Sequence, residues 1–179
     1  MEIRVANEDD ALEIRNIYAY YVENTFVSFE YEVPSVEEMK KRIMKTLKRY
    51  PYLVAVIDGK IVGYAYASSF KGRKAYDWSC ELSIYVDVNM KRKGIGKQLY
   101  NKLFAYLKKM NIKALYACLG YPNDVSENFH QSFGFQTIGH FSQCGYKFHQ
   151  WIDMIWMEKH IGQFDDTEDI IPFMEVYER

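Results

Sequence analysis

Apolar residues recur at helical spacing in two segments of the N-terminal third of the chain. The stripes are Leu12, Ile14, Ile17, Tyr18 and Tyr21 in the first segment, and Val36, Met39, Ile43 and Leu47 in the second. An apolar residue every three or four positions predicts a helix that packs one face against a core. Asn7 and Ser35 precede these stripes and are suited to cap the two helices, and Pro51 ends the second. A short strand is expected at residues 3–5.

The rest of the chain alternates short apolar runs with turn residues, which is typical of strands. Strands are expected at residues 53–57, 61–70, 76–86, 114–119, 136–141 and 150–158, and further helices at residues 94–110 and 126–133. Asp58-Gly59 predicts a tight turn between the first two of these strands, and Gly63 predicts a bulge. The order β-α-α-β-β-β-α-β-α-β-β favours a mixed α/β domain over a doubly wound parallel sheet.

Length and charge narrow the class of protein. The 179 residues fit one core, so we expect a single domain over residues 1–179. The acidic residues after Gly162 predict that residues 163–179 form a loosely ordered tail. A formal net charge of −1 gives no sign of a nucleic-acid partner. No apolar run is long enough to span a membrane, so no membrane partner is expected.

The cysteines indicate a reducing compartment. The chain has an odd number of cysteines, and no two of them form a CxxC pair; they are Cys80, Cys118 and Cys144. A disulfide framework and a zinc site are therefore not expected, and we predict no metal. Since the N-terminus is read as a strand rather than a signal peptide, a cytoplasmic location is expected.

The sharpest chemical signal is the segment Lys91-Arg92-Lys93-Gly94-Ile95-Gly96-Lys97, between a predicted strand and a predicted helix. Gly94 and Gly96 allow a ligand to approach the backbone, and the first N–H groups of the helix, from Ile95 on, lack partners within it. Together with the helix dipole these groups favour an anion such as a pyrophosphate. Further positive charge comes from Arg92, Lys93 and Lys97. The alternative is a basic helix start that only faces solvent. A Rossmann fingerprint is excluded because its third glycine is missing, and a P-loop is excluded because its Gly-Lys-Ser/Thr is missing.

This segment resembles the signature loop of the GNAT superfamily of N-acetyltransferases, Arg/Gln-x-x-Gly-x-Gly/Ala, which holds the pyrophosphate of acetyl-CoA. Here the loop begins with Lys91, which keeps the positive charge. The resemblance implies acetyl-CoA as co-substrate. It also implies the GNAT acyl-CoA N-acyltransferase fold, in which a central mixed, mostly antiparallel sheet is flanked by helices. The predicted order of elements is that of this fold.

Longer motifs resemble the phosphinothricin acetyltransferase family, over the chain up to about Glu158. They are Glu23-Asn24-Thr25, Phe29-Glu30, Tyr50-Pro51-Tyr52-Leu53-Val54-Ala55, Ala75-Tyr76-Asp77-Trp78, residues 120–124 and Gly145-Tyr146-Lys147. That family acetylates the amine of phosphinothricin, methionine sulfoximine or related amino-acid analogues. The resemblance therefore implies a small amino-acid-like amine as acceptor. With the aromatic-rich C-terminal strands, it also implies a homodimer.

Two residues are candidate catalytic groups. Glu81 is the one acid in the predicted strand 76–86, where burial would raise the pKa of a carboxyl group toward a range useful for a general base. The base proposed for the resembled family matches this position, and a structural ion pair is the alternative. His130 lies on the predicted short helix, where the resemblance implies an acid that protonates the CoA thiolate. A packed histidine is the alternative there.

The cofactor is expected to bind along the predicted strand that precedes the glycine loop. Main-chain atoms of Ile84, Tyr85 and Val86 should pair with the pantetheine arm as an added strand would. By resemblance, Asn123 binds CoA near the thiol end. Its alternative role is that of a turn residue.

The acceptor is expected to meet the basic turn at residues 71–74. Arg73 suits a substrate carboxylate because its planar fork can bind that group through two parallel hydrogen bonds. Lys71 and Tyr76 flank it and match positions of the resembled family, whereas a solvated basic turn is the alternative.

Three functions stay open at this point. A small-molecule amino-acid N-acetyltransferase is favoured by the longer motifs and by the basic turn. Acetylation of a protein N-terminus or lysine would need an open groove. A non-catalytic acetyl-CoA-binding module is disfavoured because both Glu81 and the glycine loop are present.

Overall fold

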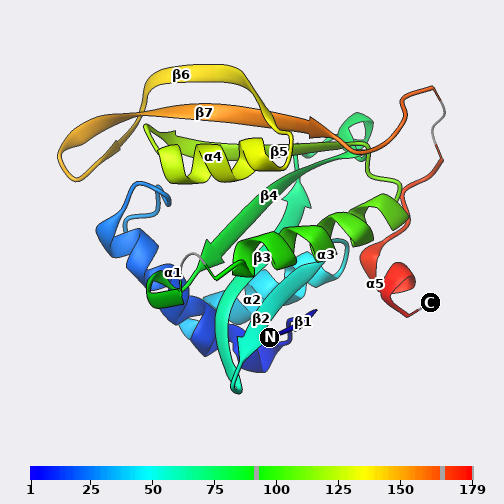
Figure 1. Ribbon diagram of the computed structural model, residues 1–179, viewed down its shortest axis with the longest axis horizontal. Coiled ribbons are helices and arrows are strands. Elements are labelled where there is room, and N and C mark those ends of the chain that lie inside the picture. Colours follow the sequence, from blue (N-terminus) through cyan, green and yellow to red (C-terminus); the bar gives the residue numbers. More distant parts are fainter. Residues whose placement is uncertain (91–92, 166–167, 179) are drawn as a thin grey trace.

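The computed structural model describes residues 1–90, 93–165 and 168–178. Its centre is a seven-stranded sheet in the order β1-β2-β3-β4-β5-β7-β6 (Figure 1). The strands are β1 (Glu2–Val5), β2 (Tyr52–Ile57), β3 (Lys60–Ser69), β4 (Ser79–Val86), β5 (Ala114–Tyr121), β6 (Gln136–Lys147) and β7 (Gln150–His160). Neighbouring strands run antiparallel, apart from β4 and β5, which run parallel. The prediction of a mixed, mostly antiparallel sheet flanked by helices is confirmed.

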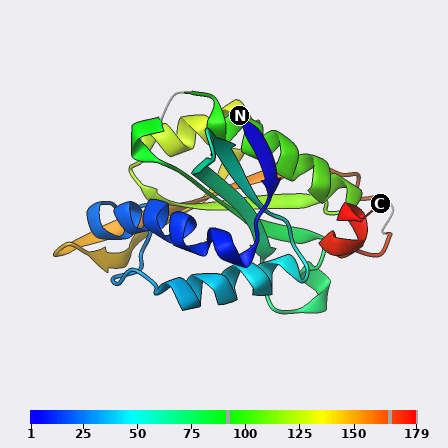
Figure 2. The ribbon, with the colours of Figure 1, turned by 90° about the horizontal axis from the view of Figure 1, so that it is seen from below.

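Helices lie on both faces of the sheet, as Figures 1 and 2 show. One face carries α1 (Ala11–Asn24) and α2 (Val36–Leu47), and the other carries α3 (Ile95–Lys109) and α4 (Asp124–Ser132). A short last helix, α5 (Phe173–Tyr177), packs beside α3. Among the described residues, no helix combines the length and the apolar content that a membrane span requires.

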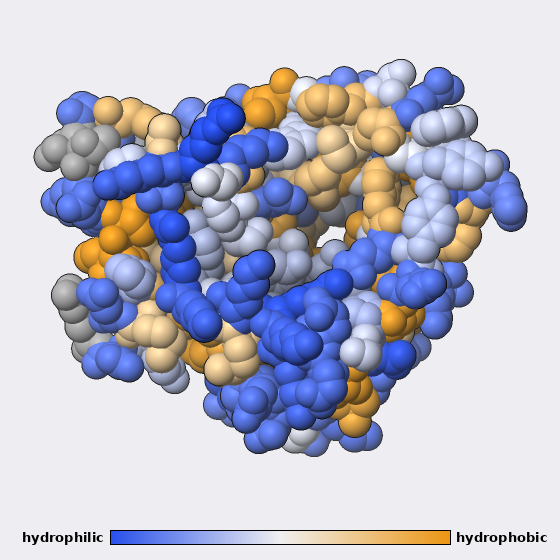
Figure 3. All heavy atoms as spheres, turned by 180° about the vertical axis from the view of Figure 1, so that it is seen from behind, coloured by the Kyte–Doolittle hydropathy of each residue, from blue (hydrophilic) through white to orange (hydrophobic). Residues whose placement is uncertain are grey.

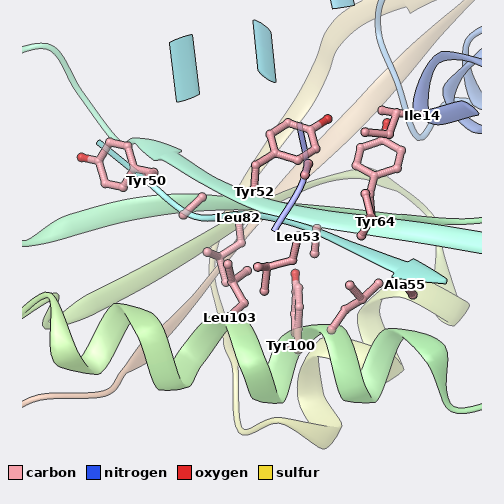
Figure 4. Close-up of a cluster of buried hydrophobic side chains, with 14 of the residues drawn as sticks. Ile14, Tyr50, Tyr52, Leu53, Ala55, Tyr64, Leu82, Tyr100 and Leu103 are labelled. Atoms are coloured by element: carbon pink, nitrogen blue, oxygen red, sulfur yellow. The ribbon is translucent and has the colours of Figure 1, made fainter. Parts of the chain in front are cut away.

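Alternate residues of the central strands supply a core on each face of the sheet, because successive side chains of a strand point to opposite sides. Tyr52 and Tyr64 point toward the side of α1 and α2, whereas Leu53 points toward α3 (Figure 4). Tyr100 and Leu103 of α3 rise to meet the sheet from that side. All five side chains are buried, so α3 is held firmly beneath the central strands.

The parallel pair β4 and β5 separates after a short start. Their paired residues are Ser79–Glu81 with Ala114–Tyr116, yet β4 continues to Val86 and β5 to Tyr121. Beyond Glu81 the two strands therefore diverge within the sheet. This divergence places a cleft between two strands that are adjacent in the strand order.

Local structure differs from expectation in two places and agrees with it in a third. The strand predicted at residues 76–86 begins only at Ser79, because Lys74–Tyr76 forms one turn of 3-10 helix. Asn7 caps a 3-10 turn, Glu8–Asp10, that precedes α1, rather than the α-helix itself. In β3, the register shift opposite Ala55 and Val56 lies beside Gly63, where a bulge was predicted.

The C-terminal tail also differs from expectation. Residues 163–179 were predicted to be loosely ordered because they are acidic, but α5 buries Phe173 completely. The Phe173 ring lies 5.1 Å from that of Tyr106 on α3. Apolar side chains between the acidic residues and the C-terminus attach this helix to the core.

Candidate active site

The divergence of β4 and β5 opens a cavity of about 490 Å³. Its lining comes from both strands, from the segment after α1 and from α4; it includes Ser28, Phe29, Glu30, Glu81, Leu82, Ser83, Ile84, Tyr85, Cys118, Leu119, Gly120, Asn123 and His130. Viewed from behind, the molecule is hollowed and an opening is visible in it (Figure 3). The cavity thus combines main-chain edges, aromatic side chains and two carboxylates, of which Glu30 is paired with Arg42.

The cleft-facing edge of β4 presents peptide groups without strand partners. Asp87 N–H donates to the carbonyl of Val62 in β3, so by the alternation of an antiparallel ladder the peptide groups of Tyr85 also face β3. Those of Ile84 and Val86 face the cleft instead. Because the Tyr21 hydroxyl donates to the Val86 carbonyl at 2.5 Å, Ile84 and the Val86 N–H remain for an extended ligand. Tyr85 also lines the cavity, although its peptide groups face β3.

The N-terminus of α3 is built as the glycine segment predicted. Gly94 is the N-cap residue with a φ of 75°, in the left-handed region that glycine adopts without strain. A Cβ at Gly96 would lie 3.2 Å from the Phe129 ring, so only glycine fits there without movement. The first turn of α3 contains no acidic residue and no side-chain cap, so its N–H groups are available to an anion.

The cationic residues of this segment are only partly described. Lys93 and Lys97 are exposed, and Ile95 is buried beneath the turn. Lys91 and Arg92, to which positive charge around the pyrophosphate was also assigned, lie outside the described residues. The part that is described fits the pyrophosphate of the expected cofactor, with backbone donors and two lysines on one side.

Glu81 lies where β4 and β5 begin to diverge. Burial raises the pKa of its carboxyl group, and the charge of Lys71 opposes that effect. Among the described residues, no cation lies within ion-pair distance of Glu81, so the structural ion pair considered as its alternative is not seen there. A carboxylate that faces a cavity with a raised pKa is suited to accept a proton.

The three residues predicted to bind the acceptor are not equally placed. The Lys71 ammonium lies 5.1 Å from the rings of both Phe70 and Trp156, near enough to Glu81 to act on its charge. All three residues are exposed beyond the end of β3, and none of them lines this cavity. Lys71 is therefore the member of the trio that the structure brings toward Glu81.

His130 is held by hydrogen bonds at both ring nitrogens. Nδ1 lies 2.8 Å from the Ser126 carbonyl, which can only accept, so Nδ1 carries the proton. In a neutral ring Nε2 then accepts from the Tyr100 hydroxyl, also at 2.8 Å. The ring is 2 % exposed, and burial lowers its pKa. The geometry therefore describes a neutral imidazole that orients Tyr100.

Asn123 is the N-cap residue of α4, a structural role that differs from the turn residue considered as its alternative, and it also lines the cavity. Its side-chain oxygen accepts from Ser126 N–H at 3.1 Å, which caps the N-terminus of α4. Since this cap uses the oxygen alone, the amide nitrogen of Asn123 is not needed for it. The residue can therefore cap a helix and contact a ligand at once.

A second cavity of about 440 Å³ adjoins the first under α2. Tyr18 and Glu30 line both cavities, and stacked rings of Tyr52 and Tyr66 form its floor, 4.7 Å apart. Arg42 also lines this cavity and binds the carboxylates of Glu30 and Glu38. The partition between the cavities is the hydrogen bond from the Tyr18 hydroxyl to Glu30, 3.1 Å long.

Several residues of the site were not singled out from the sequence. Tyr18 was read as part of a helical core stripe, and Tyr100 was not noted although it contacts His130. Lys147 was quoted only as part of a motif, yet it is buried. The hydrogen bonds of Tyr100 and Lys147 span 30 residues or more, and those of Tyr18 span 10 and 12, so sequence spacing gives no signal for these roles. In the part of the chain that the structure describes, no cluster of three or more His, Cys, Asp or Glu is arranged to hold a metal ion.

Comparisons with known proteins agree with this geometry. The family model of the acetyltransferase (GNAT) domain matches residues 3–156. The phosphinothricin N-acetyltransferase of Streptomyces viridochromogenes is 34% identical over 154 residues, 86% of this chain and 84% of that protein. Among solved structures, the GNAT phosphinothricin acetyltransferase of Sinorhizobium meliloti in complex with acetyl-CoA superposes with a TM-score of 0.89 and 32% identity, covering 94% of this chain and 92% of that one. The ribosomal-protein-alanine N-acetyltransferase of Brucella melitensis gives a TM-score of 0.87 with 31% identity, over 90% and 100% of the two chains.

Proposed function

Because the chain belongs to the GNAT family of acetyl-CoA-dependent N-acetyltransferases, we propose that it acetylates the primary amine of a small amino-acid-like compound. Phosphinothricin, methionine sulfoximine and methionine sulfone represent this class. The observation that carries the proposal is the carboxylate of Glu81, which has no ion-pair partner among the described residues and lies in a cleft that Tyr18 and Phe29 also line. A cavity of about 490 Å³ must hold the acyl end of the cofactor and the acceptor together, which favours a small acceptor.

Glu81 is the proposed general base. Acetyl-CoA supplies an acyl thioester that a neutral amine can attack. The carboxylate of Glu81 takes a proton from the amine, directly or through one water, and its raised pKa makes it a better acceptor of that proton than an ordinary glutamate. The cleft-facing N–H groups of β4 are the donors available to the acyl oxygen as charge develops on it.

Groups on both sides of the cleft receive proposed binding roles. The cleft edge at Ile84 and the Val86 N–H would pair with the pantetheine arm, and the N-terminus of α3 would hold the pyrophosphate. Asn123, at the opposite wall, would contact the arm near its thiol end. On the acceptor side, Lys71 would approach the substrate beside Glu81, and Arg73 and Tyr76 would bind parts of the acceptor that extend out of the cavity.

The direct test is a panel of amines with purified protein and acetyl-CoA, followed by release of free thiol. We expect turnover with methionine sulfone or phosphinothricin, and little turnover with amines that lack a carboxylate. The proposal would be overturned if none of the amino-acid analogues gave thiol release while a peptide did. Arg73→Ala should then raise the acceptor KM about tenfold while leaving the acetyl-CoA KM unchanged, since a bidentate contact to a carboxylate is lost.

A second candidate function follows from one neighbour. The likeness to a ribosomal-protein-alanine N-acetyltransferase suggests a protein N-terminus as acceptor. Such an acceptor needs an open groove for the residues that follow the amine. Here Phe29 and Glu30 line the cavity on that side, which supports the small acceptor instead.

We also propose that the protein is a cytoplasmic homodimer. Four large apolar side chains, Ile138, Phe141, Phe148 and Trp151, are exposed on β6, β7 and the turn between them, at 45 to 62 %. An exposed group of this kind on one edge of a sheet suits a self-complementary contact. Light scattering should give twice the chain mass of 21.3 kDa, and a monomer at micromolar concentration would contradict this.

A further inference from the structure

Lys147 is a buried lysine at the tip of the β6–β7 hairpin. It is the last residue of β6 and is only 3 % exposed. Lysine is seldom buried unless its ammonium group is fully hydrogen-bonded. Here burial lowers the pKa of the ammonium, and the charge of Glu30 opposes that effect.

The ammonium group donates to three main-chain carbonyls. Nζ lies 2.6 Å from the Val22 oxygen, 3.0 Å from that of Thr25 and 2.7 Å from that of Ser28. Val22 lies in the last turn of α1, whose carbonyls have no partners within the helix and form the negative end of its dipole. Three donors thus meet three acceptors, and among the described residues no carboxylate forms an ion pair with Lys147.

Two of the three carbonyls that Lys147 binds, those of Thr25 and Ser28, belong to the segment that walls the cavity. Residues 25–30 have no helix or strand of their own, and they carry Ser28, Phe29 and Glu30 to the cavity lining. The same segment and the residue directly after it, Tyr31, each meet the hairpin once more. A Cβ at Gly145 would overlap the Phe29 ring, and the Tyr31 hydroxyl donates to the Tyr146 carbonyl.

We propose that Lys147 is a positioning residue that fixes the 25–30 segment against the β6–β7 hairpin and so shapes the acceptor side of the active site. This inference rests on the proposed function for its acceptor. The cofactor contacts at Ile84 and the N-terminus of α3 come from other elements, so they do not depend on Lys147. Loss of the ammonium group should therefore act on the acceptor and spare acetyl-CoA.

The test compares Lys147→Met, which keeps the length of the side chain without its donors, with Lys147→Arg. We expect Lys147→Met to raise the acceptor KM tenfold or more, with the acetyl-CoA dissociation constant within twofold of wild type. Lys147→Arg should recover part of the loss, because it keeps the charge and several donors. Lys41→Met, at an exposed lysine of α2, is the matched control and should leave both constants unchanged.

Hydrogen exchange tests the same inference without any acceptor. In Lys147→Met, amides of residues 25–30 should exchange at least tenfold faster, whereas those of α3 should keep their protection. The proposal would be overturned if the exchange rates of residues 25–30 were unchanged. It would also be overturned if the whole protein lost protection equally and acetyl-CoA bound more weakly. Because this readout needs no turnover, it separates a wrong role for Lys147 from a wrong acceptor class.

Discussion

At the scale of single residues, burial has opposite consequences for the two candidate catalytic groups. Glu81 faces the cavity with no ion-pair partner among the described residues, and burial raises the pKa of its carboxyl group. His130 is buried with both ring nitrogens bonded, and burial lowers its pKa. A base gains from the first change, whereas an acid that must carry a positive charge loses from the second. The sequence pattern identified both residues, but it did not show which side chains and carbonyls would contact them.

Glu81→Gln should abolish most of the acetyl transfer. The amide cannot take a proton from the amine, so we expect kcat/KM at neutral pH to fall about a hundredfold or more, with the acetyl-CoA dissociation constant unchanged. In the wild type, kcat/KM should rise as the pH passes through the raised pKa of Glu81. The pH–rate profile of the variant should lack this rise on its acidic side. Glu175→Gln, at an exposed glutamate of α5, is the control. A variant with full activity would show that Glu81 is not the base.

The same substitution should stabilise the protein at neutral pH. Since the pKa of Glu81 is raised in the folded state, the unfolded chain loses its proton first as pH rises, and the folded protein is penalised. This penalty is absent below the ordinary pKa of a glutamate, 4.5, and complete above the raised pKa. Melting curves should therefore show Glu81→Gln above wild type at pH 7 and level with it near pH 4. A difference of equal size at both pH values would contradict this.

His130→Asn should change stability more than catalysis. Asn can keep the hydrogen bond to the Ser126 carbonyl, but it leaves the buried Tyr100 hydroxyl without its acceptor, at a cost of about 1–3 kcal/mol. Adding Tyr100→Phe should recover part of that free energy of unfolding. The alkaline limb of the pH–rate profile should keep its position. If His130→Asn removes that limb, His130 is the acid that the resemblance implied.

At the scale of elements, the divergence of β4 from β5 creates the site. Sequence patterns predict where the two strands lie along the chain, but they do not predict where the strands separate. The helices, the order of strands and the glycine turn follow from periodicity and capping residues. The end of pairing after Glu81 does not, because both strands continue as apolar runs with no break in pattern. The turn of Lys74–Tyr76 was also missed, since its residues continue the pattern of the strand that follows.

Gly94→Val should weaken acetyl-CoA binding by at least tenfold. Its φ of 75° is unfavourable for a β-branched residue by more than 1 kcal/mol, so the first turn of α3 must shift. Gly59→Val is a matched control, since Gly59 has a φ of 76° in the β2–β3 turn and neither glycine has an atom within 4 Å of an added Cβ. Both variants should lose stability, measured by thermal unfolding, but calorimetry should show weaker cofactor binding for Gly94→Val alone. Equal affinity in the two would contradict the anion site.

At the scale of the whole molecule, segments distant in sequence hold the site together. The hairpin of β6 and β7 reaches back to the end of α1 through Lys147, and the C-terminal helix α5 returns to α3. Phe173 inserts among the buried residues of α3, where the charge of the tail had suggested loose order. The tail is rich in acidic residues, but its buried apolar side chains, Phe173 and Val176, attach α5 to the core.

Phe173→Ala should destabilise the fold by about 3 kcal/mol, as expected for truncating a fully buried aromatic side chain. Met174→Ala, at the exposed neighbour in the same helix, is the control and should cost little. Thermal unfolding monitored by circular dichroism provides the measurement. If the two variants melt together, α5 is not part of the core.

The central claim is that the Glu81 cleft acetylates a small amino-acid-like amine. A competition measures it most directly: wild-type protein with limiting acetyl-CoA, methionine sulfone and a short peptide with an N-terminal alanine in one vessel, with products identified by mass spectrometry. The account predicts acetylated methionine sulfone as the main product, and neither product in quantity with Glu81→Gln. Acetylated peptide as the main product would contradict it.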